Sequence, residues 1–113
     1  MAYQSFESLE VWQRSCRLAR DVYKVLNDCR DFGLKDQMTR AAVSIASNIA
    51  EGYERGSNRE FVRFLNIASG SAAELRTQLY IAYSVDLIDG ESKDRLVEET
   101  RGIGAMLRAL AKS

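Results

Sequence analysis

The sequence predicts an all-α protein folded as an up-down-up-down antiparallel four-helix bundle. Apolar residues recur every three or four positions along four long segments, which is the spacing of one helix face. Proline is absent, so nothing forbids long helices. The links between segments are short, as they are between antiparallel neighbours in a bundle. A chain of 113 residues buries enough surface for one core, so residues 1–113 are expected to form a single domain.

The first two segments run from about Leu9 to Cys29 and from about Leu34 to Arg55. In the first, the alternating spacing of three and four predicts a core-facing seam of Leu9, Trp12, Cys16, Ala19, Tyr23 and Leu26. In the second, the same spacing predicts a seam of Met38, Ala42, Ile45, Ile49 and Gly52. The second segment is also rich in alanine and serine, which allow neighbouring helices to approach closely.

The last two segments run from about Ser57 to Ser84 and from about Gly90 to Ala111. The third has the seam Phe61, Leu65, Ala68, Ala72, Leu75, Leu79 and Ala82, and the fourth has Leu96, Ile103, Met106, Leu107 and Leu110. A capping box begins the third segment directly after Gly56, and Asp89 is the expected N-cap of the fourth. Gly70, in the middle of the third segment, indicates a close backbone approach.

Composition limits the function. The chain has 16 basic and 16 acidic residues and a net charge of zero, which argues against a surface that binds polyanions throughout. Histidine is absent, and the two cysteines, Cys16 and Cys29, form no CxxC pair. No signal peptide and no membrane-spanning stretch is recognisable. The expected location is therefore the cytoplasm, with no membrane role.

No catalytic constellation is recognisable either. Serine and cysteine nucleophiles would lack a histidine base, and neither a metal-ligand pattern nor a glycine-rich phosphate loop is present. We expect no catalytic residue, no metal and no cofactor, and hence a protein that binds or assembles rather than an enzyme.

Polar side chains recur along one side of the second segment, and we call them the polar stripe: Gln37, Arg40, Ser44, Asn48 and Glu51. The stripe is either a binding groove or subunit interface, or an ordinary solvated face. On the third segment, Glu74 is a candidate to bond Arg40 or Asn48. A row of basic residues on the first segment could hold phosphates or could simply be solvated; its cations are Arg17, Arg20 and Lys24.

Three ordered motifs resemble one known family, that of the small four-helix-bundle proteins encoded in intervening sequences of bacterial large-subunit ribosomal RNA genes. The first is FESLEVWQ at residues 6–13, and the second is LKDQMTRAAVSIASNIAEG at residues 34–52. The third is REFVRFL at residues 59–65, followed by Ala68, Gly70, Ser71 and Glu74. The resemblance covers nearly the whole chain and also extends to accessory proteins of diversity-generating retroelements.

The resemblance implies a bundle that assembles as a ring, typically a pentamer, with RNA or DNA as a partner. The family's signature positions fall here on Gln37, Arg40, Ser44, Asn48, Glu51, Gly52, Gly70 and Glu74. Phosphate contacts would fall on Arg17, Arg20, Lys24, Arg59 and Arg63. The alternative is an oligomeric scaffold that binds copies of itself or another protein and has no nucleic-acid role.

Overall fold

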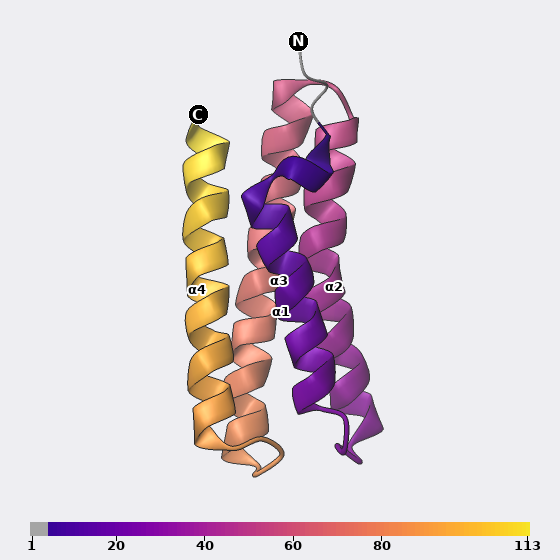
Figure 1. Ribbon diagram of the computed structural model, residues 1–113, viewed down its shortest axis with the longest axis vertical. Helices are drawn as coiled ribbons and strands as arrows, with labels where there is room; N and C mark the ends of the chain where they lie inside the picture. The colour runs from indigo at the N-terminus through magenta and orange to yellow at the C-terminus, as the bar shows by residue number, and fades with distance from the viewer. Residues whose placement is uncertain (1–4) are drawn as a thin grey trace.

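The computed structural model describes residues 5–113. After a short 3-10 turn, η1 (Phe6–Ser8), four helices follow: α1 (Glu10–Val25), α2 (Phe32–Glu54), α3 (Asn58–Ser84) and α4 (Gly90–Lys112). They run side by side and alternate in direction along a bundle that measures 49 × 22 × 21 Å (Figure 1). The predicted four-helix architecture is therefore confirmed.

Side chains cap the beginnings of three helices. The carboxylate of Asp31 accepts a hydrogen bond from the backbone N–H of Leu34 at the start of α2. At the start of α3, the hydroxyl of Ser57 accepts a hydrogen bond from the backbone N–H of Glu60, as the capping box predicts. The predicted N-cap of α4 is also confirmed, because Asp89 accepts from the N–H of Ser92. Bonds from Ser92 hold the pKa of Asp89 below its usual range.

The turns at the two ends of α3 use left-handed backbone conformations. Gly56, between α2 and α3, has a φ of 83°, which costs glycine little. Asp86, after α3, has a φ of 65°. The N–H of Leu87 donates to the carbonyl of Ala82 at 2.8 Å, and the N–H of Asp86 donates to that of Tyr83. This is a Schellman motif, which satisfies the last carbonyls of α3 and returns the chain into α4.

The predicted seams of α2 and α3 lie in the core. All five predicted residues of α2 are buried, and so are all seven of α3 except Phe61, which is half-buried. In α4, Leu96, Ile103 and Leu107 are buried, whereas Met106 and Leu110 pack at the edge of the core. The spacing of apolar residues therefore located the core face of these three helices.

The predicted seam of α1 lies mostly at the edge of the core, where Leu9, Trp12 and Ala19 are half-buried and pack against it. The residues of α1 that reach the core are Val11, Ser15, Leu18 and Val22, with Leu26 just beyond the helix. Of the predicted seam, only Leu26 is fully buried, and Tyr23 is 52% exposed. The true core face carries the polar Ser15, whose hydroxyl donates to the carbonyl of Val11 at 2.7 Å within the helix. A serine satisfied in this way can be buried at little cost.

One arginine of α1 bonds across to α4. Arg14 reaches across to the carboxylate of Glu99 at 2.6 Å and also contacts the sulfur of Met106. A side chain at Gly102 would collide with this guanidinium, so the glycine leaves the space that Arg14 occupies. Within the described residues, none of the helices is both long and apolar enough to cross a membrane.

Candidate interaction surface

The middle of the polar stripe joins α2 to α3. The hydroxyls of Ser44 and Ser71 lie 2.9 Å apart across the two helices. The amide of Asn48 donates to both the carbonyl and the hydroxyl of Ser44, at 2.8 and 2.9 Å. All three side chains are half-buried. Ser44 therefore links α2 to α3 within one chain, and Asn48 bonds this serine from within α2.

Helices α2 and α3 approach each other closely at Gly52. A Cβ on Gly52 would lie 2.5 Å from the Cβ of Phe64, closer than two such atoms can come. The guanidinium groups of Arg55 and Arg63 cover the ring of Phe64, at 5.0 and 4.7 Å from its centroid. This signature glycine thus has a packing role near the α2–α3 corner.

The outer members of the polar stripe face solvent. Arg40 pairs with Asp36 one turn earlier, at 2.8 Å, and its side chain is 78% exposed. Glu51 pairs with Arg55 at 2.8 Å, and both are exposed. Gln37 is exposed as well. The structure thus divides the stripe into a half-buried centre, which serves the fold, and exposed residues that are available to another molecule.

Two expectations about α3 are wrong for the single chain. Within residues 5–113, no other helix approaches Gly70: apart from its chain neighbours and its own helix backbone, no atom lies within 4 Å of the place its Cβ would occupy. Glu74 bonds neither Arg40 nor Asn48 and instead accepts a hydrogen bond from Gln78 at 3.4 Å. Both residues face outward because they lie on the side of α3 opposite the core.

The candidate phosphate contacts form two separate groups. Arg17, Arg20 and Lys24 are exposed on the side of α1 that points away from the core, and Arg20 pairs with Asp21. Arg59 and Arg63 lie instead at the start of α3, beside the α2–α3 corner. Arg63 is partly committed there, because it donates to Glu60 at 3.1 Å.

A surface groove between α1 and α2 was missed by the reasoning from sequence. We call it the α1–α2 groove; its volume is about 400 Å³ and its lining is mostly apolar: Phe6, Trp12, Cys16, Ala19, Val43, Ala46, Ser47 and Ala50. Three of these residues belong to the seam that was expected in the core of the same chain. The signal was therefore present in the sequence, because α1 carries two apolar stripes and the bundle needs only one.

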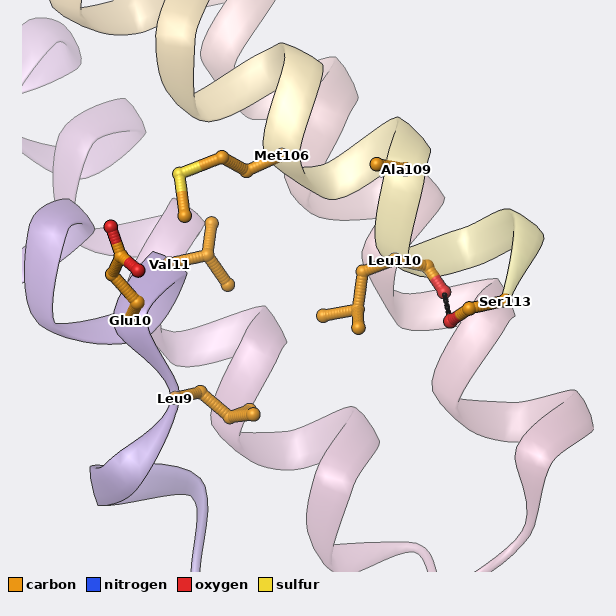
Figure 2. A pocket seen from close by; sticks show the side chains of 7 residues that line it. All are labelled: Leu9, Glu10, Val11, Met106, Ala109, Leu110 and Ser113. Carbon is orange, nitrogen blue, oxygen red and sulfur yellow. Dashed lines mark hydrogen bonds between the residues drawn. The ribbon is translucent and has the colours of Figure 1, made fainter.

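A second apolar groove lies between the beginning of α1 and the end of α4, with a volume of about 410 Å³. Figure 2 shows Leu9 and Val11 reaching into it from one side and Met106 and Leu110 from the other. The hydroxyl of Ser113 at its rim is turned to the carbonyl of Leu110. The groove brings no set of polar groups to a common point, which catalysis would need.

Side chains that could bind metal do not gather anywhere in residues 5–113: no group of three or more cysteines and carboxylates lies together there. Both cysteines are free thiols. Burial raises the pKa of the Cys16 thiol, which keeps it protonated at neutral pH. Cys16 thus acts as a small apolar group in the wall of the α1–α2 groove.

Comparison with known proteins agrees with the fold and the motifs. The model of the 23S rRNA-intervening sequence protein family matches residues 7–109. A crystal structure of a protein of unknown function from the S23 ribosomal protein family of Bacteroides thetaiotaomicron is similar in fold, with a TM-score of 0.85. That protein is 27% identical, and the alignment covers 91% of this chain and 99% of that one. A search of curated proteins finds no match. The chain belongs to the 23S rRNA-intervening sequence protein family.

Proposed function

We propose that this protein is a non-catalytic building block that assembles with copies of itself into a closed ring. The observation that carries the proposal is the second apolar stripe of α1. Trp12, Cys16 and Ala19 form one wall of the α1–α2 groove, and Val43 and Ala46 form the other. Contiguous apolar surface of this kind is typical of protein contact sites.

A ring, rather than a two-fold dimer, follows if the groove is covered by a different surface of the next copy. The exposed side of α3 offers such a surface, since Ile67 and Ile81 are 41% and 48% exposed there. A contact between two different surfaces is heterologous, and it closes into a ring when the rotation between copies allows it. The family resemblance favours five copies, and the free thiols suit a reducing compartment such as the cytoplasm.

Val43 provides the test because it lies in the α1–α2 groove and is 43% exposed. Val43→Asp should reduce the mass in solution to that of one chain, 12.7 kDa, because assembly would bury an unpaired carboxylate. Light scattering measures the mass, and circular dichroism should show unchanged helix content. Ala105→Asp, on the exposed side of α4, is the matched control and should assemble normally. A Val43→Asp variant that assembles like the wild type would refute the proposal.

Nucleic-acid binding is a second candidate function, favoured by the row of Arg17, Arg20 and Lys24. All three side chains are exposed on the outer side of α1, and a ring would display this row once per subunit. Because the net charge is zero, attraction to phosphates would be local and strongly dependent on salt.

Filter binding with structured ribosomal RNA tests this candidate. The wild type should retain RNA at low salt and lose most of it at moderate salt. The triple variant Arg17→Ala, Arg20→Ala and Lys24→Ala should bind at least tenfold more weakly. Each phosphate contact that is lost reduces the number of counterions that binding releases from the RNA. A wild-type protein that retains no RNA even at low salt rules this function out and leaves the assembly proposal intact.

A further inference from the structure

Two rows of exposed residues run along the outer sides of α2 and α3. The α2 row consists of Arg40, Val43, Ser47 and Glu51, and the α3 row consists of Arg63, Ile67, Gly70 and Glu74. Each row begins with a basic residue, continues with apolar or small residues and ends with an acidic residue. Two such rows attract one another only when they run in opposite directions.

Contacts between α2 and α3 within one chain show which residues are level, that is, which lie at the same height along the bundle axis. The hydroxyls of Ser44 and Ser71 meet at 2.9 Å, so these two residues are level. The helices are antiparallel, and each rises about 1.5 Å per residue. The step back from Ser44 to Arg40 therefore moves the same way as the step forward from Ser71 to Glu74. Arg40 and Glu74 consequently lie at nearly the same level.

The other ends of the rows match in the same way. Gly52 and Phe64 are level, because a Cβ on the glycine would touch the Cβ of Phe64. Because the helices are antiparallel, the steps back from Gly52 to Glu51 and from Phe64 to Arg63 move in opposite directions, so Glu51 and Arg63 lie within about 3 Å of the same level. Each charged end of the α2 row thus has an opposite charge at its own height on α3.

In a ring whose axis runs along the bundle, every copy lies at the same height. Rotation about that axis does not shift one copy along it, so residues at equal levels meet across each contact. If α2 of one copy lies against α3 of the next, Arg40 meets Glu74 and Glu51 meets Arg63. Gly70 lies between these two pairs. No side chain of its own chain covers it, so the backbone of a second copy could approach it closely.

The present partners of these charges do not hold them firmly. Arg40 bonds Asp36, Glu51 bonds Arg55 and Arg63 bonds Glu60, each about one turn away and each in a pair with an exposed arginine. Such pairs within a helix contribute little to stability, so they can exchange partners at small cost. Arg63 also lies over the ring of Phe64. From the part of the chain that the structure describes, Glu74 receives one hydrogen bond, the long one from Gln78.

We propose that the α2 row of each copy packs antiparallel on the α3 row of a second copy, with ion pairs Arg40–Glu74 and Glu51–Arg63 around a close contact at Gly70. This inference rests on the proposed self-assembly and specifies its surface. The small centre of the α2 row continues into the α1–α2 groove through Val43 and Ser47, so one continuous face would be covered.

Charge reversal with rescue tests the arrangement. Arg40→Glu and Glu74→Arg should each raise the protein concentration needed for half-assembly at least tenfold, because like charges would then face one another. The double variant should return to within about threefold of the wild type. Arg95→Glu, an exposed position on α4, is the matched control and should leave assembly unchanged. Analytical ultracentrifugation over a dilution series measures all four variants beside the wild type.

The outcomes separate this inference from the proposed function. If the wild type assembles but the single reversals have no effect, or the double variant is not rescued, the rows are not the interface and self-assembly through another surface stands. If the wild type is a single chain at every concentration, both ideas fail. A pairing of Arg40 with Glu74 within one chain would change the thermal midpoint of dilute, unassembled protein without changing the half-assembly concentration, and would overturn the inference.

Discussion

Replacing Leu18 by alanine should lower the free energy of unfolding by about 2–5 kcal/mol, the range for emptying a well-packed leucine site. Leu18 is fully buried at the centre of the core face of α1. The measurement is urea unfolding followed by circular dichroism, with every variant made in the Val43→Asp background so that assembly does not contribute. In the single chain, this loss should be larger than the loss caused by Gly52→Ala.

Tyr23→Ala is the matched comparison for Leu18→Ala, because it tests the other stripe of α1. Tyr23 belongs to the stripe that the sequence placed in the core, but it is half exposed in the structure. Its replacement should change the free energy of unfolding by no more than about 0.5 kcal/mol, as for most surface substitutions. Equal losses for the two variants, or a larger loss for Tyr23→Ala, would mean that α1 faces the core with its other stripe.

Gly52→Ala should destabilise the bundle by about 1–3 kcal/mol, the usual range for overpacking. The new methyl would meet the Cβ of Phe64 at 2.5 Å. That atom is fixed to the backbone of α3, so no side-chain rotation relieves the clash. Because alanine is the better helix former by about 1 kcal/mol, a net loss shows that crowding outweighs helix propensity. Urea unfolding in the same background measures it.

Gly70→Ala is the matched control on α3, and its effect should have the opposite sign. Nothing lies near the position of the new Cβ, so the single chain should gain about 0.5–1 kcal/mol from the greater helix propensity of alanine. If both glycines responded alike, the close approach of α2 and α3 at Gly52 would be contradicted. In the assembling wild-type background, Gly70→Ala should instead weaken assembly.

Much of the fold could be predicted because α2 and α3 each carry one dominant apolar stripe. Their seams had no rival on the same helix, and the ends of α3 and α4 were marked by Ser57 and Asp89, whose short side chains cap a helix in a local and recognisable way.

The face of α1 could not be predicted in this way because two stripes compete there. The stripe with Trp12 and Tyr23 is the bulkier one, whereas the true core face is interrupted by Ser15. Spacing cannot show that the hydroxyl of Ser15 is satisfied by Val11 in its own helix. An apolar stripe that the chain only half buries needs another explanation, and the proposed contact with a second copy would supply one.

The polar stripe could be located from the sequence, but the roles of its members could not. Residues three and four apart share a face, which places Ser44, Asn48 and Glu51 together. Which of them turn toward α3 depends on the rotation of α2 about its own axis, and the spacing of polar residues does not give that rotation. In the structure, Ser44 bonds Ser71 of α3, Asn48 bonds Ser44 within α2, and Glu51 lies at the surface.

The mass of the wild-type protein in solution tests the central claim of self-assembly most directly. Native mass spectrometry across a range of concentrations should show a defined multiple of the 12.7 kDa chain, and the family resemblance favours five copies. Val43→Asp should be found as a single chain under the same conditions. A wild-type protein that remains a single 12.7 kDa chain at every concentration would contradict the account.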